Sequence, residues 1–410
     1  MNPATTVTGE PVDQFMRRHL AGDFLLWSPN IQADAFLNWD RIWATRRIAA
    51  GAPRPLPVAA RPLDITFDSG GRTYTLEELM RWEFISGLLL VKDGQVRLER
   101  YAMDLTPERC WQASSMTKSL ASMLVGAALH DGAIRSTEQE ITDWLPEFKG
   151  TAYAPVKLVD LLRMASGVRW TENTDDLRCD VADYIRAIAA RKPGHILDHL
   201  KKLPRANPVG TQFYYNTGDT FLLGHILKRA TGMTVADYCA RKIWQPMGCE
   251  HDGYFLLDAD DGMEVMGSCN GATLRDYARW GLLMLADGVA ANGERILPEG
   301  WVAESTHASA PNFAYDFYGA RGVPGKAGEI FSGYGYLWWT YAGGDYQARG
   351  SYGQWVYVSP AHNAVAVLLG AVPRHVYMTP EERAIHQDSS HSGSRLRLDF
   401  IRAAMRAMAR

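Results

Sequence analysis

Residues 115–118 read Ser-Met-Thr-Lys and stand at the start of an apolar run, from Leu120 to Leu129, that predicts a buried helix. A serine and a lysine three residues apart share one face of a helix, so the Lys118 ammonium group can reach the Ser115 hydroxyl. That hydroxyl becomes a nucleophile when a neighbouring base takes its proton, which a lysine does once burial lowers its pKa. The pattern is short, and the alternative is that Ser115 caps the helix while Lys118 lies in solvent.

Two later stretches accompany this pattern. Tyr214-Tyr215-Asn216 follows in the middle of the chain, and Ala348-Arg349-Gly350-Ser351 predicts a strand that contains glycine near the C-terminus. Ser-x-x-Lys, then Tyr-x-Asn, then a strand in the place of Lys-Thr-Gly resemble, in this order, the signature of the serine β-lactamase and penicillin-binding-protein superfamily. The ordered set is more specific than any one of its members.

The resemblance is strongest to the class C branch of this superfamily. Residues 161–167 read Leu-Leu-Arg-Met-Ala-Ser-Gly and are similar to the Leu-Leu-x-His-x-Ser-Gly stretch of that branch. Within it, the chain most resembles the 6-aminohexanoate-dimer hydrolases and related carboxylesterases, around Ser115, at residues 274–276 and from Gly353 to Pro360. The resemblance covers roughly residues 84–408. It implies an α/β (α+β) fold of the β-lactamase type, in which helices flank an antiparallel sheet and an all-helical subdomain is inserted.

The turn and helix signals divide the chain into three parts. Residues 1–83 are rich in proline and tryptophan and are expected to form an extension packed on the main domain. Residues 84–148 and 268–410 are expected to form the α/β sheet subdomain. Residues 149–267 alternate helical stretches with turns and predict the all-helical subdomain.

Several local elements of the sheet subdomain can be predicted from short patterns. Asp93-Gly94 between two apolar runs predicts a β-hairpin. Residues 273–276 resemble a capping box that opens a helix to about Ala286. Strands are expected over residues 346–353 and 354–369, with the second stretch broken at Ser359-Pro360, and a terminal amphipathic helix over residues 395–408.

The family resemblance implies roles for the second motif. The Tyr214 phenol would lie beside Ser115 and Lys118 as a proton relay or general base, and Asn216 would hydrogen-bond Lys118 or a substrate amide. Tyr215, the middle residue, is assigned to packing. The alternative is that all three adjacent aromatic residues, from Phe213 to Tyr215, are core residues.

The third motif departs from the family at its first position, where β-lactamases have Lys or His and this chain has Ala348. Gly350 would allow close backbone approach, and the Ser351 N–H would join the Ser115 N–H as an oxyanion hole. Without the cation, a β-lactam carboxylate loses a partner, so efficient β-lactamase activity is not expected unless Arg349 replaces the charge. Residues 391–393 match His-x-Gly by letter but lead into the terminal helix, so they are rejected.

Composition excludes several function classes. A formal net charge of −3 provides no basic footprint for nucleic acid, and no apolar run approaches the ~18 residues that span a bilayer. The N-terminus lacks a signal-peptide pattern, and the five cysteines are scattered without Cys-x-x-Cys spacing. We therefore expect a cytoplasmic protein without a metal or cofactor, acting on a small-molecule amide or ester; a homodimer is possible.

Other candidate functional residues can also be explained by ordinary structural roles. The acidic residues of the 172–183 stretch could border the cleft and receive a substrate ammonium, or form a solvated loop: Glu172, Asp175, Asp176, Asp180 and Asp183. Trp338, Trp339 and Trp355 could line an acyl pocket, or pack in the core. His386 and His391 are expected on the surface and not at a metal.

The hypothesis from sequence is a serine hydrolase that cleaves a small linear amide, of the aminohexanoate-oligomer or short-peptide kind, through an acyl-enzyme on Ser115. A carboxylesterase of the same fold is the first alternative. A binding module in which Ser115 is acylated without turnover is the alternative from another class. The Gly-x-Ser-x-Gly elbow of α/β-hydrolases is absent from the sequence.

Overall fold

The centre of the protein is a seven-stranded antiparallel sheet. In the computed structural model, residues 27–172, 178–313, 331–374, 377–386 and 395–409 are described. The strand order is β5-β4-β13-β12-β11-β10-β9. The strands are β4 (Ile85–Lys92), β5 (Gln95–Tyr101), β9 (Gly333–Tyr334), β10 (Trp339–Thr340), β11 (Tyr346–Gly350), β12 (Gln354–Ser359) and β13 (Ala364–Gly370).

The hairpin predicted at Asp93-Gly94 joins β4 to β5. Lys92 pairs with Gln95, so the loop contains only these two residues, and both have positive φ, +52° for Asp93 and +74° for Gly94. A two-residue loop with both φ values positive matches the right-handed twist of the flanking strands. The hairpin is therefore confirmed, and β4 lies inside the sheet between β5 and β13.

Helices cover both faces of this sheet. Helix α11 (Leu274–Leu285) packs on β12 and β13, where a Cβ at Gly281 would lie 2.6 Å from Val365. Its N-cap is Thr273, whose side chain accepts a hydrogen bond from the Asp276 N–H, as the capping pattern predicts. On the opposite face, Arg397 of helix α14 (Arg395–Met408) lies over the ring of Trp355. The predicted terminal helix is confirmed.

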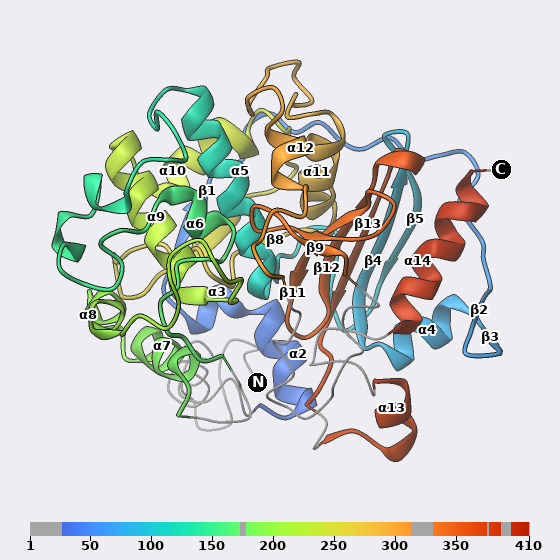
Figure 1. Cartoon of the computed structure of the whole chain (residues 1–410). Coiled ribbons are helices and arrows are strands. Elements are labelled where there is room, and N and C mark those ends of the chain that lie inside the picture. Colours follow the sequence, from blue (N-terminus) through green and yellow to red (C-terminus); the bar gives the residue numbers. More distant parts are fainter. Residues whose placement is uncertain (1–26, 173–177, 314–330, 375–376, 387–394, 410) are drawn as a thin grey trace, which may run out of the picture.

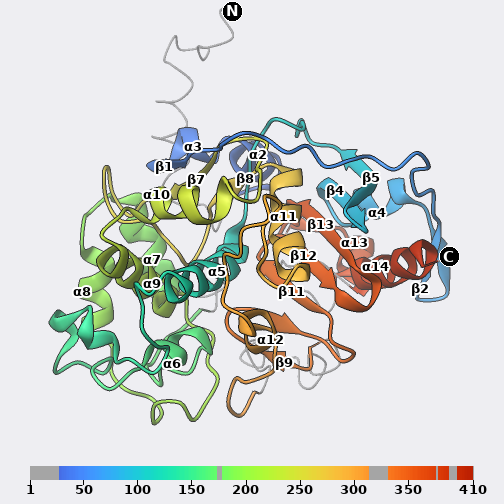
Figure 2. The ribbon, with the colours of Figure 1, turned by 90° about the horizontal axis from the view of Figure 1, so that it is seen from above.

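A second group of helices lies to one side of the seven-stranded sheet. Helix α5 (Thr117–His130) lies between this group and the sheet (Figures 1 and 2). Most of its residues are buried, as the apolar run predicts. The group contains α6 (Leu158–Leu162), α7 (Asp180–Ala189), α8 (His195–Lys202), α9 (Thr217–Thr231) and α10 (Val235–Cys239).

A second, four-stranded sheet joins segments from distant parts of the chain, in the order β1-β7-β8-β6. Its strand β7 (Gly253–Leu256) lies within the stretch that we expected to be all-helical, which corrects that expectation. A Cβ at Gly253 would lie 2.6 Å from Trp244 and 2.8 Å from the Gly271 carbonyl oxygen, so glycine permits this close packing. The other strands are β1 (Thr45–Ile48), β6 (Trp111–Gln112) and β8 (Gly271–Ala272).

The described part of the N-terminal segment, from residue 27 on, packs on the main body. Phe36 of α2 (Pro29–Leu37) contacts Trp111 and Tyr352, with ring centroids 5.8 and 5.2 Å apart. The three-part division of the chain stays a prediction. The remaining elements are α3 (Trp39–Ile42), β2 (Phe67–Ser69), β3 (Arg72–Tyr74), α4 (Leu76–Trp82), α12 (Trp301–Ser305) and α13 (Pro380–Ile385).

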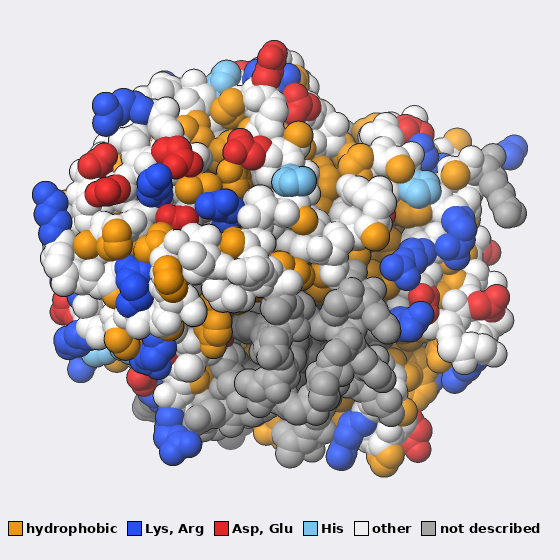
Figure 3. Space-filling model, viewed as in Figure 1, with side chains coloured by type: hydrophobic (Ala, Val, Ile, Leu, Met, Phe, Trp, Pro, Cys, Tyr) orange, Lys and Arg blue, Asp and Glu red, His pale blue; other side chains and the backbone are white. Residues whose placement is uncertain are grey.

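The described part of the chain contains no helix with the length and apolar character needed to cross a bilayer. On the face in Figure 3, acidic and basic side chains are interspersed.

Candidate active site

Ser115 lies in a short 3₁₀ turn, Ser114–Met116, that leads directly into α5. Ser114 has a φ of +45°, an uncommon conformation for a residue with a side chain. Its neighbours hold it there: the Gln112 Oε1 accepts from the Ser114 N–H at 2.6 Å, and the Ser114 carbonyl oxygen accepts from the Cys269 N–H at 3.0 Å. Such strain persists where surrounding structure fixes it and is typical of functional sites.

The structure brings Lys118 to Ser115. The Lys118 Nζ lies 3.0 Å from the Ser115 Oγ and donates to the Gly267 carbonyl oxygen at 2.6 Å. Burial lowers the pKa of Lys118 to about 8, although the charge of Glu172 acts in the opposite direction. A lysine with this pKa is neutral near pH 7 far more often than an ordinary lysine, and the neutral amine can accept a proton from serine.

Tyr215, and not Tyr214, is the tyrosine that lies against Lys118. The Lys118 Nζ is 4.8 Å from the centroid of the Tyr215 ring, and this ring stacks on Trp339 at 5.7 Å with an interplanar angle of 21°. Tyr215 is 6% exposed, whereas Tyr214 is 47% exposed. The structure therefore corrects the expectation that Tyr214 reaches the site and Tyr215 only packs.

The physical reason is the alternation of side chains in an extended segment. Phe213 and Tyr215 are buried and point to one side, while Tyr214 between them points to the other. The sequence does not show whether Tyr214 or Tyr215 faces the site, because aromatic residues occupy all three positions. Matching the letters of Tyr-x-Asn selected Tyr214, one residue before the tyrosine that lies against Lys118.

Asn216 is a helix cap and does not contact Lys118. Its Oδ1 accepts from the Asp219 N–H at 3.2 Å at the start of α9, and its Nδ2 lies 3.4 Å from the Tyr153 hydroxyl. Asparagine is among the preferred residues at this position. The expectation that Asn216 bonds Lys118 is wrong for this structure.

Glu172 bonds to residues next to the site, whereas Asp180 and Asp183, the other described acidic residues of the stretch, have different partners. The Glu172 carboxylate accepts from Trp170 and Thr217. Asp180 is buried and bonded to Thr171 and His199, and Asp183 forms an exposed ion pair with Arg186. Asp175 and Asp176 lie outside the described residues. Nothing in the sequence distinguishes Glu172 from the other acidic residues of this stretch.

Gly350 allows β11 to approach the nucleophile turn. A Cβ at this position would clash with the Ala113 carbonyl oxygen and lie 3.0 Å from the Ser114 Cβ. The close approach that the third motif predicts is therefore present. Ser351 follows at the end of the strand and is exposed, and its carbonyl oxygen accepts from the Gln354 Nε2 at 3.3 Å.

Arg349 lies on the opposite face of β11 from Gly350. Its guanidinium carbon is 5.2 Å from the ring centroid of Phe331 and 4.8 Å from that of Trp355, on the side of the sheet covered by α14. Because neighbouring residues in a strand point to opposite faces, the side chain of Arg349 leaves β11 on the other face from the side chain of Ala348. Ala348 itself is fully buried.

The tryptophans and histidines divide between site and core. Trp339 stacks on Tyr215, whereas Trp338 packs on Tyr346. His386 is buried, with its Nε2 2.9 Å from the Trp82 carbonyl oxygen, which corrects its expected surface position. His391 lies outside the described residues. Among the described residues, no group of three or more side chains is placed to hold a metal ion.

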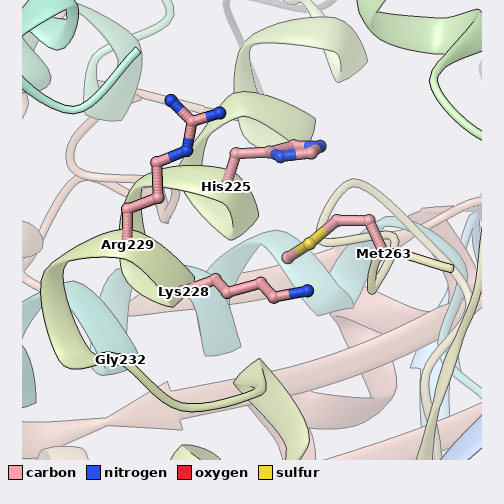
Figure 4. A pocket seen from close by; sticks show the side chains of 5 residues that line it. All are labelled: His225, Lys228, Arg229, Gly232 and Met263. Atoms are coloured by element: carbon pink, nitrogen blue, oxygen red, sulfur yellow. The ribbon is translucent and has the colours of Figure 1, made fainter.

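A pocket of about 520 Å³ lies at the far end of α9, around Gly232, the C-cap of this helix (Figure 4). Asn216 and the site stand at the opposite end, so this pocket is separate from Ser115. The guanidinium of Arg229, which lines it, already pairs with Glu147, and burial lowers the pKa of His225 to about 4. The other lining residues are Lys228 and Met263.

A model of the β-lactamase family matches residues 85–386, which contain every residue of the site. The chain belongs to the β-lactamase family. Membership in this family of serine hydrolases confirms the resemblance drawn from the three ordered motifs, and the expected fold of an antiparallel sheet with flanking helices is confirmed as well.

Individual proteins are similar over most of the chain. A 6-aminohexanoate-dimer hydrolase of Paenarthrobacter ureafaciens is 26% identical over 347 residues, which cover 81% of this chain and 85% of that protein. The solved structure of a putative 6-aminohexanoate-dimer hydrolase from Bacillus anthracis superposes with a TM-score of 0.74 at 21% identity, over 95% of this chain and 96% of that one. A family VIII carboxylesterase has a TM-score of 0.54 at 15% identity, over 78% and 91%.

Proposed function

We propose that the protein cleaves a small linear amide through an acyl-enzyme on Ser115. The observation that carries this proposal is the 3.0 Å contact between the Ser115 Oγ and the Nζ of a buried Lys118 whose pKa burial lowers to about 8. Tyr215 takes the role that the family resemblance had suggested for Tyr214, because its ring lies on the Lys118 Nζ.

The proposed reaction has two halves. Neutral Lys118 takes the proton of the Ser115 hydroxyl, and the Oγ attacks the substrate carbonyl carbon. The backbone N–H groups of Ser115 and Ser351 donate to the oxygen that becomes negative. The proton passes, with Tyr215 as a relay, to the leaving amine as the carbon–nitrogen bond breaks. Water then adds to the acyl group, transfers its proton back through the same groups and releases Ser115.

The substrate class is suggested by the name of the Paenarthrobacter relative, a hydrolase of the 6-aminohexanoate dimer. An ester would use the same site with a different leaving group, and the likeness to a family VIII carboxylesterase keeps that alternative open. β-Lactams are proposed to be poor substrates, because Ala348 is uncharged and Arg349 points to the other face of β11. Acylation without turnover is the third possibility.

A substrate panel tests these proposals. The panel contains the linear 6-aminohexanoate dimer, p-nitrophenyl esters, a D-amino-acid peptide and nitrocefin, assayed with the wild type and with Ser115→Ala. We expect the amide to be cleaved best, nitrocefin hydrolysis to be far slower, and Ser115→Ala to lose all turnover. A fluorophosphonate should label Ser115, as mapped on the modified peptide.

Each alternative has its own outcome in this panel. A label on another serine would refute the site. A burst of product without steady-state release would identify an acyl-binding module, and faster ester than amide cleavage would identify a carboxylesterase. Comparable efficiency on nitrocefin and on the best substrate would contradict the argument from Ala348.

A further inference from the structure

Three hydrogen-bond donors converge on the carboxylate of Glu172. The Trp170 Nε1 donates to its Oε2 at 2.7 Å, and the Thr217 N–H donates to the same oxygen at 3.1 Å. The Thr217 hydroxyl donates to the other oxygen, Oε1, at 2.6 Å. Charge-assisted hydrogen bonds of this length are among the strong ones, so Glu172 holds Thr217 by both its backbone and its side chain.

Thr217 connects Glu172 to the groups around Lys118. It is the first residue of α9 and lies two residues after Tyr215, whose ring packs on the Lys118 Nζ. Thr217 also packs on Gly267, where a Cβ would lie 2.6 Å from the Thr217 Cγ2. The Gly267 carbonyl oxygen in turn accepts from the Lys118 Nζ at 2.6 Å. Two partners of Lys118 are therefore placed by one threonine.

We propose that Glu172 is a positioning residue of the active site: it holds Thr217, and through Thr217 it fixes Tyr215 and the Gly267 carbonyl oxygen around Lys118. This inference rests on the proposed hydrolase function. For Glu172 it replaces the expectation of a residue that receives a substrate ammonium, because both oxygens of Glu172 already accept hydrogen bonds from the protein.

The charge of Glu172 has a separate, measurable effect. A nearby negative charge favours the ammonium form of Lys118 and so opposes the effect of burial. The other titratable groups facing Lys118 are Tyr215 and Cys269, and burial raises the pKa of the Cys269 thiol to about 12. The charge of Glu172 also reaches three buried groups whose pKa burial raises: Tyr184, Tyr334 and Asp219. Neutralising Glu172 should therefore lower the pKa of Lys118 below its present value.

The test measures the rate at which a fluorophosphonate labels Ser115 as a function of pH in the full-length protein. In Glu172→Gln, the midpoint of the acid limb should move to lower pH by about half a unit or more. The plateau rate should fall about tenfold or more, because Tyr215 loses its support. In Thr217→Val the plateau should fall similarly, while the midpoint stays near that of the wild type because Glu172 keeps its charge.

Asp183→Asn provides the matched control. It removes one acidic charge from the same stretch at an exposed position, and it should change neither the plateau nor the midpoint. Circular dichroism and thermal melting establish that each variant is folded. If Glu172→Gln fails to fold, the plateau of Thr217→Val decides the positioning role.

Three results would overturn the inference. These are an unchanged midpoint in Glu172→Gln, an unchanged plateau in Thr217→Val, or a Glu172→Gln effect limited to a higher KM for substrates that carry an ammonium group. The last result would assign Glu172 to substrate binding. A wild type that is not labelled at Ser115 would instead refute the proposed function, so the two failures are distinct.

Discussion

At the residue scale, the two adjacent tyrosines provide an internal comparison. Tyr215→Phe keeps the ring that packs on Lys118 and Trp339 and removes only the phenol oxygen. If this oxygen relays the proton, kcat should fall by orders of magnitude, with a smaller change in KM. Tyr214→Phe alters an exposed side chain and should change kcat by only a few fold.

Steady-state kinetics on the best substrate of the panel measure both variants, with melting temperatures as the control for folding. A Tyr215→Phe enzyme within about twofold of the wild-type kcat would mean that Tyr215 only packs. A large loss in Tyr214→Phe would return the role to Tyr214.

The state of Lys118 should set the pH dependence of activity. The ammonium form has no lone pair, so kcat/KM should be low when Lys118 is protonated and should rise as the pH passes the pKa of about 8. The direction follows from burial, which disfavours the charged form and moves the pKa down from 10.5. A pH profile of kcat/KM measures the midpoint. An acid limb centred near pH 10 would show that the pKa of Lys118 is not lowered in the free enzyme, and a kcat/KM without an acid limb in this range would show that Lys118 is not the base.

At the element scale, the turn between β11 and β12 is held by one buried glutamine. The Gln354 Nε2 donates to the carbonyl oxygens of Gly370, at 2.6 Å, and Ser351, at 3.3 Å. Its Oε1 accepts from the Trp111 Nε1 and the Gly370 N–H, both at 3.1 Å. Gln354 therefore ties the turn that carries Ser351 both to β13 and to β6, the strand that leads to Ser115.

Substitutions at Ser351 test whether its backbone N–H stabilises the oxyanion. Ser351→Ala keeps this donor and should change kcat by only a few fold, whereas Ser351→Pro removes it and should lower kcat about 10²-fold or more. Because proline at the end of a strand can disturb the sheet, circular dichroism and melting must first show that both variants fold. Near-normal kcat in a folded Ser351→Pro enzyme contradicts the oxyanion role. A large loss in Ser351→Ala moves the role to the hydroxyl.

At the scale of the whole molecule, one fully buried ion pair joins the terminal helix to the start of the sheet. The Arg397 Nε lies 2.8 Å from the Glu83 Oε2, and both side chains are 0% exposed. The remaining guanidinium nitrogens donate to the carbonyl oxygens of Glu83 and Gly353, each at 2.6 Å. Arg397 thus connects α14 to Glu83, which lies just before β4, and to Gly353 in the turn after Ser351.

Arg397→Met should remove the guanidinium that pairs with the buried Glu83 carboxylate and lower the free energy of unfolding by about 3–5 kcal/mol. The double variant Glu83→Gln with Arg397→Met also removes the buried negative charge and should recover part of this loss. Urea unfolding of the single and double variants measures both values. A single variant as stable as the wild type would show that the pair contributes little to stability.

Much of the local structure could be predicted because it depends on neighbours in the sequence. The Asp93-Gly94 hairpin, the Thr273 cap and the terminal helix are set by turn chemistry, capping and periodicity within a few residues. The prediction that residues 149–267 are all helical is wrong at β7, because this short strand forms by pairing with β1 and β8 and not from a strand pattern in its own residues.

The pairing of Ser115 with Lys118 could be predicted from the sequence, because a spacing of three residues within one helical turn leaves little choice of geometry. Three other contacts depend on tertiary packing: Tyr215 and not Tyr214 meets Lys118, Asn216 caps α9, and Glu172 holds Thr217. Each of these outcomes depends on which side of a segment faces a partner that is distant in the chain. The period of a sequence pattern fixes how side chains alternate, but packing against the rest of the molecule fixes which of the two phases is turned toward the site.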